Sequence, residues 1–298
     1  MSRSSSRWTA GLALCAGIVA LGVGFTAITS DSPDESEATT QEVLPLGPQG
    51  VVAQFVVECS FSHSAPDDPI VFPGEPGASH QHHFFGASST DADSTPESLR
   101  ASETSCQTAA DTAAYWAPAL YVDGVEVQPS KLNAYYRPGP GVDPAEVQAH
   151  PAGLAIVSGD HTSTEAQPLN VVGWHCGSSP SLSADPPSCP RTAGLALRVT
   201  FPDCWDGEHL DSDDHRSHMA LSQDGACPSS HPVAVPQLVL DIHYPVTGDA
   251  TVALASGTPH SAHADFFNGW DQDALEREVG ACINRSLVCG VVSNRATG

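Results

Sequence analysis

Eight cysteines spread between Cys59 and Cys289 constrain the fold of this chain more than any other feature of its sequence. An even number of cysteines in an exported chain is typical of a disulfide framework. Zinc ligation is the alternative, but no C-x2-C pair occurs, so we interpret all eight as disulfide-bonded. Eight cysteines allow about 105 pairings. Short separations along the chain favour three pairs and leave a fourth, with other pairings still open: Cys176–Cys189, Cys204–Cys227, Cys282–Cys289 and Cys59–Cys106.

The first 30 residues have the pattern of a targeting segment. Arg3 and Arg7 precede the uncharged apolar run 10–27, as in a secretory signal peptide. The run is near the length that spans a bilayer, and no clear cleavage site follows it, so an uncleaved signal anchor is the alternative. We therefore predict a secreted or extracellular protein whose only contact with a membrane is through this segment.

Residues 31–50 are predicted to be an acidic, disordered linker, because acidic residues alternate there with Ser, Thr, Pro and Gly and leave little to bury. The remainder, residues 51–298, is long enough for one domain with a sizeable core. We predict a single disulfide-stapled, β-rich domain there.

The charge balance excludes several classes of partner. The chain has 35 acidic and 11 basic residues, a formal charge of −24, and Lys131 is its only lysine. Binding to nucleic acid or to an anionic membrane surface requires clustered Lys and Arg, so neither is expected. No P-loop and no Rossmann glycine pattern occurs, so we expect no nucleotide cofactor. An acidic chain suits a cation or a neutral polymer as partner, although the charge can also serve solubility alone.

The apolar residues after position 51 mostly recur with period two, which is typical of strands. Leu195, Leu197 and Val199 alternate with smaller or polar residues as in a half-buried strand, and Asp123-Gly124 predicts a hairpin turn. With 25 Gly and 25 Pro, the connections should be long loops. We predict a mainly β fold, a β-sandwich or jelly-roll-like, with these strands: 51–59, 120–127, 131–136, 153–158, 170–176, 195–201, 236–244 and 251–255.

One convincing helix is predicted near the C-terminus, at residues 271–283. Leu275, Val279 and Ile283 fall on one face, and Asn268 or Asp271 can cap the N-terminus. A second, short helix is suggested around residues 96–101.

Two short segments place histidines and a carboxylate on strand faces. His80 and His82 share one face of an extended segment, and two imidazoles on one face are a common half of a metal site. His263 and Asp265 share a face in the same way. We therefore predict one divalent metal ion with His80, His82 and His263 as ligands, and we assign Asp265 to catalysis. The alternative is that these histidines are ordinary polar surface groups.

A third segment, residues 206–218, crowds six acidic and imidazole groups together: Asp206, Asp211, Asp213, Asp214, His215 and His218. Such crowding is costly unless a cation, hydrogen bonds or water offset it. The segment lacks the Gly and Glu positions of an EF-hand. It can supply an acid/base pair for hydrolysis, for which we predict Asp214 and His215. The alternative is an acidic surface loop tied down by Cys204.

Four tryptophans follow the export segment, each beside a motif-like stretch: Trp116, Trp174, Trp205 and Trp270. Indole faces stack on sugar rings, and acidic groups hydrogen-bond hydroxyls. We predict Trp205, Trp270, Trp116 and Asp206 as substrate-binding residues. Core packing beside disulfides is the alternative, above all for Trp174.

Taken together, the motifs form an ordered series along the chain. The series comprises His80-x-His82-x-Phe84-x-Gly86, Tyr115-Trp116-x-Pro118, Gly173-Trp174-x-Cys176, Phe201-Pro202-x-Cys204-Trp205-Asp206-Gly207, Leu210-Asp211-Ser212-x-Asp214-His215-x-Ser217-His218 and His263-x-Asp265-Phe266-x-Asn268-Gly269-Trp270-Asp271. It resembles a large secreted family, common in fungi and present in actinobacteria, whose domain is labelled only as of unknown function. Members of that family are sometimes fused to WSC-type or CFEM-type modules. The resemblance covers roughly residues 51–289. It implies secretion and a cell-wall or polysaccharide setting, and it implies that the His and Asp segments belong to one site.

The leading hypothesis from the sequence is an extracellular carbohydrate-active hydrolase with a His/Asp site, acting on polysaccharide or cell-wall glycan. The main alternative is a non-catalytic surface protein that binds a metal or a glycan. A purely structural envelope protein is the third reading. All functional assignments depend on the three distant segments folding together around one hollow.

Overall fold

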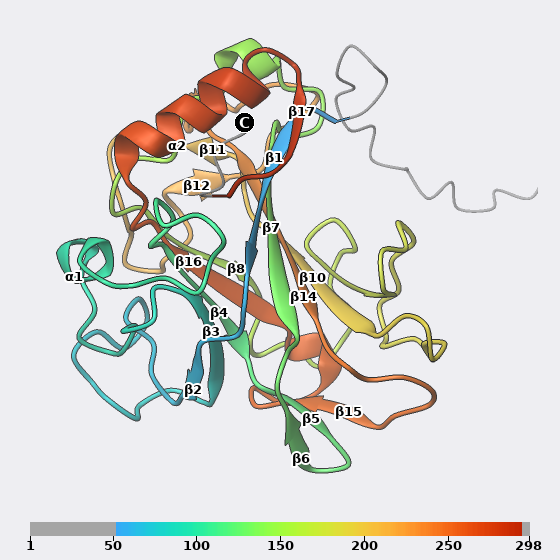
Figure 1. The fold of residues 1–298 in the computed structure, drawn as a ribbon. Helices are drawn as coiled ribbons and strands as arrows, with labels where there is room; N and C mark the ends of the chain where they lie inside the picture. Colours follow the sequence, from blue (N-terminus) through green and yellow to red (C-terminus); the bar gives the residue numbers. More distant parts are fainter. Residues whose placement is uncertain (1–51, 294–298) are drawn as a thin grey trace, which may run out of the picture. The chain divides into compact units, whose positions relative to one another are not determined.

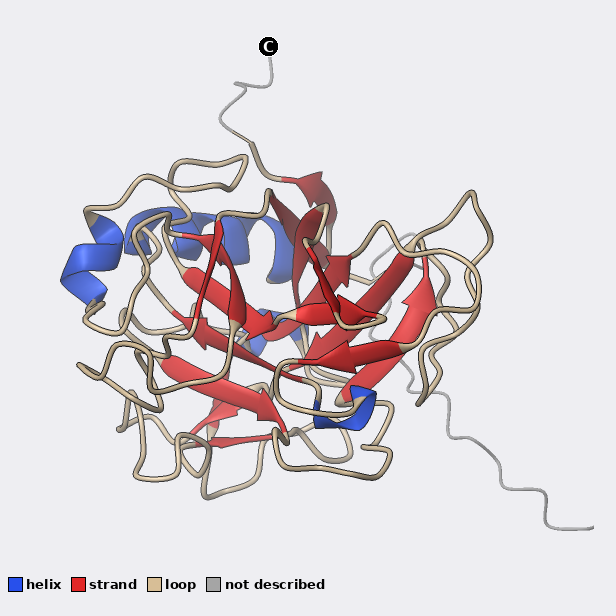
Figure 2. Cartoon of the chain, turned by 90° about the horizontal axis from the view of Figure 1, so that it is seen from below, coloured by secondary structure: helices blue, strands red, loops and turns tan. Residues whose placement is uncertain are grey.

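The computed structural model describes residues 52–293, so the predicted signal segment and acidic linker lie outside the described residues. Strands dominate the domain, and long loops connect them (Figures 1 and 2). The prediction of a mainly β fold is confirmed. Within the described residues, no helix is long and apolar enough to cross a bilayer.

The larger sheet has six strands, antiparallel except for one parallel pair at its edge. In spatial order they are β17 (Val288–Val291), β1 (Gln54–Cys59), β7 (Lys131–Arg137), β14 (Gln237–His243), β10 (Leu195–Thr200) and β9 (Val172–Cys176). The second sheet has five antiparallel strands, in the order β2 (His63–Ala65), β3 (His82–Gly86), β4 (Ala114–Pro118), β16 (His263–Phe267) and β8 (Ala155–Gly159).

Two small sheets flank the large ones. One orders β12 (Met219–Ala220), β11 (Cys204–Trp205) and β13 (Val233–Ala234); the other orders β15 (Val252–Leu254), β5 (Leu120–Val122) and β6 (Val125–Val127). The turn between β5 and β6 has positive φ at Asp123 (50°) and Gly124 (80°), which is the backbone that a two-residue hairpin requires. The hairpin predicted from Asp123-Gly124 is confirmed.

The two large sheets share one apolar core. Phe55 and Leu240 of the six-stranded sheet belong to the same buried cluster as Tyr115, Ile156 and Phe266 of the five-stranded sheet. Side chains that alternate along a strand point to opposite faces, so the neighbours of these residues face the other way. On the far face of the five-stranded sheet a second, smaller cluster forms. That second face holds the site described below.

The strand predictions are confirmed, with boundaries within a few residues, and β10 shows one difference. Its Leu195, Leu197 and Val199 are buried as expected, but Ala196 is buried as well. Ala196 lies between His175 of β9 and His243 of β14 in the ladder, and these larger side chains cover it. The strand is therefore covered on both faces rather than half-buried.

The C-terminal helix begins as predicted. Asp271 accepts a hydrogen bond from the backbone N–H of Ala274 at 2.8 Å and caps α2 (Gln272–Glu278), which continues as the π-helical turn Val279–Ile283. The short helix also exists, as α1 (Pro96–Arg100), with Thr95 as its cap. Three short 3-10 or π turns, Pro144–Glu146 and Pro259–Ser261 among them, complete the helical content of the described part of the chain.

All four disulfides pair as the spacing favoured: Cys59–Cys106, Cys176–Cys189, Cys204–Cys227 and Cys282–Cys289. Four disulfides in one domain indicate an extracellular or secreted protein, because reducing compartments keep thiols free.

A buried polar chain crosses the core between the two sheets. The Tyr115 hydroxyl donates to Asp111 at 2.7 Å and lies in hydrogen-bond contact with the Tyr136 hydroxyl. The indole N–H of Trp270 donates to the Tyr136 hydroxyl at 3.0 Å. Burial raises the pKa of Asp111 from 3.8 to about 7.

Removal of the longest disulfide loop should destabilise the domain most. Cys59 and Cys106 are 47 positions apart, and Cys282 and Cys289 only 7. Loop-closure entropy predicts a loss of about 4 kcal/mol in the free energy of unfolding for the Cys59→Ala/Cys106→Ala pair and about 2 kcal/mol for Cys282→Ala/Cys289→Ala. Equilibrium denaturation in urea measures both variants. The reverse order of stabilities would contradict the entropic argument.

Asp111 should make stability depend on pH. The folded chain binds the Asp111 proton more tightly than the unfolded chain, so this group favours folding below pH 3.8 and loses that contribution as the pH rises to about 7. Asp111→Asn keeps an acceptor for Tyr115 but does not titrate. We expect this variant to lose less stability than the wild type between pH 4 and 7, measured by urea denaturation at fixed pH steps; parallel curves would refute it.

A candidate metal site on the five-stranded sheet

The register of the five-stranded sheet brings two histidines and a carboxylate to one face. His82 of β3 lies opposite Pro118 of β4, and Asp265 of β16 lies opposite Trp116, two positions earlier in β4. His263 shares the face of Asp265 because the two are separated by one residue in β16. Segments that are far apart in the chain therefore meet where β3, β4 and β16 run side by side (Figure 1).

The imidazoles are within coordination distance of one another. One ligand nitrogen each of His80, His82 and His263 can be chosen so that all lie within 4.8 Å. The ring centroids are 4.3 Å apart for His80 and His82, 5.0 Å for His80 and His263, and 5.8 Å for His82 and His263. This is the spacing at which one ion can contact three rings.

A second group of possible ligands adjoins the first. Ligand atoms of Asp68, His82 and Asp265 also lie within 4.8 Å of one another, so His82 belongs to both groups. Asp68 comes from the loop that precedes β3. The site thus combines three imidazoles with two carboxylates.

Most of this cluster is removed from solvent. His82 is 0% exposed, Asp265 1%, and Asp68 and His263 4% each, whereas His80 is half-buried. Solvent therefore reaches the cluster on the side of His80. Burying polar groups without partners is costly, so a cluster of this kind requires compensation.

Two backbone contacts determine which nitrogen of each buried ring carries the proton. His82 Nδ1 lies 2.9 Å from the carbonyl oxygen of Asp67, and His263 Nδ1 lies 2.9 Å from that of Ser261. A carbonyl can only accept, so Nδ1 is the donor in both rings and Nε2 of the neutral ring has a lone pair. Metal-bound histidines usually have this backbone contact on the other nitrogen.

The surroundings keep the three rings neutral, which is the form that binds metal. Burial lowers the pKa of His80 to about 4 and that of His263 to about 3, from an ordinary value of 6.5. Burial likewise holds the pKa of His82 well below its ordinary value, and the neighbouring rings lower it further. The His82 Nε2 atom is buried and has no hydrogen-bond partner among the described residues.

Burial shifts the pKa values of the two carboxylates upward, in the opposite direction from those of the histidines. Burial raises the pKa of Asp265 well above its ordinary value, and the nearby Asp68 raises it further. Burial also raises the pKa of Asp68, whose Oδ1 accepts from the backbone N–H groups of Ile70 and Val71 at 3.0 and 2.9 Å. Both oxygens of Asp265 are buried without a partner within residues 52–293.

A divalent cation would satisfy these groups together. It would use imidazole lone pairs that have no other acceptor role, and its two positive charges would balance two carboxylates. Three imidazoles with a neighbouring carboxylate suit zinc or copper better than calcium, which prefers oxygen ligands. The donor set therefore fits a metal on chemical grounds.

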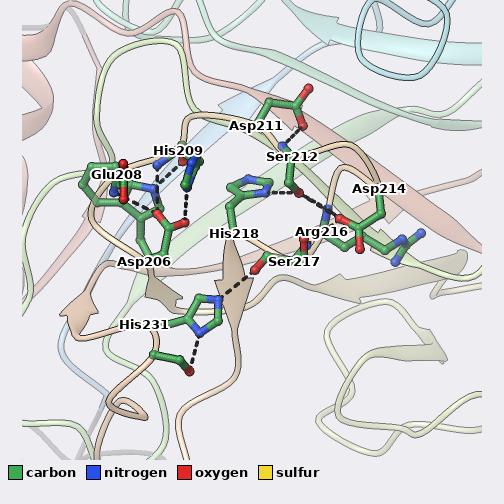
Figure 3. A network of polar contacts seen from close by, with 12 residues as sticks. Asp206, Glu208, His209, Asp211, Ser212, Asp214, Arg216, Ser217, His218 and His231 are labelled. Atoms are coloured by element: carbon green, nitrogen blue, oxygen red, sulfur yellow. Dashed lines mark hydrogen bonds and ion pairs between the residues drawn. The ribbon is translucent and has the colours of Figure 1, made fainter.

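The loop 206–218 lies beside the site rather than within it. Its backbone pairs with the outer edge of β8: Ala155 N–H donates to the Leu210 carbonyl at 2.9 Å, and Val157 N–H to the His215 carbonyl at 3.4 Å. The Asp214 carboxylate is occupied by its own loop (Figure 3), accepting from Ser212 Oγ and the backbone N–H of Ser217, each at 2.8 Å. His215 Nδ1 contacts Asp211 at 3.0 Å.

Asp206, at the start of that loop, also makes its contacts locally. Asp206 accepts from the backbone N–H groups of Glu208 and His209 and contacts His209 Nδ1 at 2.7 Å. The contacts of Asp206, like those of Asp214, maintain the shape of the loop.

The tryptophans chosen for sugar binding differ in exposure. Trp116 is 0% exposed and Trp270 1%, so neither presents a ring face to solvent. Trp116 packs against Phe84 on the sheet face that carries the candidate site, at a ring separation of 5.6 Å. Trp205 is half-buried, and its indole N–H donates to the His209 carbonyl. Of the three, only Trp205 keeps part of its ring accessible.

Sequence patterns did not reveal two neighbours of the cluster. Asp68 lies in a loop, where no strand alternation relates it to His82; its only signal is the acidic pair Asp67-Asp68 before Pro69. His161 follows β8, and its exposed ring lies 5.9 Å from that of His263. A lone histidine after a strand has no distinguishing pattern.

Comparison with known proteins gives one match. Neither the curated proteins nor the solved structures include a significant match to this chain. A family model described as "Domain of unknown function (DUF1996)" matches residues 68–270, more than half of the chain and all five residues of the cluster. The chain therefore belongs to the DUF1996 family of domains of unknown function.

Proposed function

We propose that this protein is an exported metalloprotein that binds one divalent metal ion through His80, His82 and His263, and that it hydrolyses a bond in a cell-wall polysaccharide. One observation supports the metal more than any other. Two buried imidazoles, His82 and His263, donate Nδ1–H to backbone carbonyls, which leaves a lone pair on each Nε2. One ligand nitrogen from each of these rings and one from His80 lie within 4.8 Å of one another. No general requirement of folding calls for two buried histidines and a half-buried one to lie side by side.

Asp265 is the best candidate for a catalytic group. A divalent metal lowers the pKa of a water bound to it and so supplies a nucleophile at neutral pH. Asp265 lies beside His82, two residues from His263, with both oxygens free of other partners in the described structure. A carboxylate in that position can accept a proton from the water and return it to a leaving group. Asp68, anchored by two backbone N–H groups, would hold the charge balance of the site.

The polysaccharide part of the proposal has separate support. Four disulfides indicate an exported domain, and the acid-rich chain is unsuited to polyanionic nucleic acid. Trp205 presents part of an aromatic face next to Asp206, a pairing that suits a sugar ring with hydroxyl groups. A cell-wall glycan is a substrate that such a protein meets outside the cell.

A non-catalytic protein that binds a metal or a glycan at the cell surface is the second candidate. One observation favours it: His82 and His263 are almost completely buried, and only His80 is in partial contact with solvent. Structural metal sites are closed, whereas catalytic ones keep an open position for water and substrate.

Metal content should depend on the buried histidines. We expect the purified domain to retain about one equivalent of zinc or copper after dialysis, because a structural or catalytic ion with three imidazole ligands dissociates slowly. His82→Ala and His263→Ala should lose it, as measured by elemental mass spectrometry. His209→Ala, at an exposed histidine of the 206–218 loop, is the matched control and should retain the metal. Wild-type protein that never binds metal would disprove the centre.

Turnover should depend on Asp265 separately from metal content. We expect Asp265→Asn to keep the metal yet release no reducing ends from a panel of wall polysaccharides, because the amide cannot accept the proton. Asp214→Asn, which alters only the loop contacts, should keep most of the activity. Metal-bound wild type that releases nothing from any polysaccharide would favour the non-catalytic alternative, and full activity in Asp265→Asn would remove that residue from the mechanism.

A further inference from the structure

The 206–218 loop is the segment richest in acidic and imidazole groups, yet it contributes no residue to the group of possible metal ligands. It runs along the outer edge of β8, where the His215 carbonyl accepts from Val157 N–H. Val157 lies directly opposite Asp265 in the pairing of β8 with β16. The residue after His215 is therefore placed next to the candidate site, one strand away from its carboxylate.

The end of this loop is held in a fixed shape. The Asp214 carboxylate accepts from the backbone N–H groups of Arg216 and Ser217, and Ser212 Oγ contacts both Asp214 and His218 Nδ1 (Figure 3). His218 Nε2 lies 2.8 Å from the Ala155 carbonyl, which fastens the loop to β8. These contacts also hold His215 at a positive φ of 58°, a backbone conformation that is rare for a residue with a side chain.

Arg216 lies at the centre of this network, and its side chain takes no part in it. Its backbone N–H is bonded, but among residues 52–293 its guanidinium makes no hydrogen bond or ion pair, and no dashed line reaches it in Figure 3. An unpaired arginine is notable in a chain with 35 acidic residues. Arg198, by contrast, forms a bidentate ion pair with Asp241: its Nε and Nη2 donate to the two carboxylate oxygens at 2.7 and 2.6 Å.

The positive charge of Arg216 lies near the five-residue cluster of possible metal ligands. Arg216 is close enough to His263 and Asp265 for its charge to act on both, in agreement with the pairing of the loop with β8. Two histidines are further basic groups on this side: the ring of His161 lies 5.9 Å from that of His263, and the charge of His215 acts on Asp68. The nearby Asp160 is occupied by Thr162, whose backbone N–H and hydroxyl donate to it at 2.8 and 2.7 Å.

We infer that Arg216 binds an anionic substituent, a carboxylate or a phosphate, on the glycan that enters the metal site. This inference rests on the proposed function. A guanidinium presents paired N–H groups that match the two oxygens of either anion, and the loop contacts hold the backbone of Arg216 in place, so that binding has to order only its side chain. The substrate would thus be an acidic glycan rather than a neutral one, although the protein itself is strongly acidic.

Binding to cobalt-loaded protein tests the inference without an activity assay. Three monosaccharide probes are used, glucose, glucuronate and glucose 6-phosphate, and each is titrated against the visible spectrum of the bound Co²⁺. We expect one or both acidic sugars to perturb the spectrum at concentrations at which glucose does not. In Arg216→Gln the dissociation constant for the acidic sugar should rise about tenfold, while the affinity for Co²⁺ stays within about twofold. Preference between the two acidic sugars identifies the anion.

Two further variants sharpen the comparison. Arg277→Gln removes an exposed arginine from α2 and should bind as the wild type does. Arg216→Lys keeps the charge but not the paired N–H groups and should recover only part of the affinity. Equal binding of glucose and glucuronate, unchanged binding in Arg216→Gln, or no binding of any probe to cobalt-loaded wild type would overturn the inference. Failure to load Co²⁺ at all would instead overturn the metal centre.

Discussion

The hydrogen bond from His82 Nδ1 to the carbonyl of Asp67 joins the two halves of the candidate site. It holds the loop before β3 against the sheet, which brings Asp68 next to His82. It also fixes the tautomer of a ring that has no contact with solvent, so that the other nitrogen faces the cluster with a lone pair.

The two faces of the five-stranded sheet differ: one packs in the main core and the other carries the candidate site. Its inner face, with Tyr115 and Phe266, closes the main core against the six-stranded sheet. Its outer face carries the polar cluster, and Phe84 and Trp116 pack on that same face beside His82 and Asp265. A rigid sheet with a packed layer beneath it can hold side chains to the accuracy that metal binding requires. The burial of Trp116 is therefore a structural support for the site, whatever its relation to a ligand.

The sequence predicted most of the fold and four of the five residues of the cluster, for identifiable reasons. Strand alternation gave the face shared by His263 and Asp265, and cysteine spacing gave all four disulfides. His80 and His82 do lie close together as predicted, although His80 precedes β3 instead of belonging to it. Asp68 could not be predicted as part of the cluster, because a loop residue has no periodic relation to its neighbours in the sequence. The direction of each tryptophan was also beyond prediction, because a tryptophan beside a motif packs inward or outward depending on contacts between distant segments.

The distance along the chain between the ligands has a consequence for how the protein matures. His82 lies on β3 and His263 on β16, far apart along the sequence of the domain. The two residues become neighbours in space only after β4 has paired with both strands. The ion would therefore enter a domain that has already folded and oxidised, and would not nucleate it. Its identity would then be decided by the metals present in the extracytoplasmic space, where affinity alone does not choose between zinc and copper.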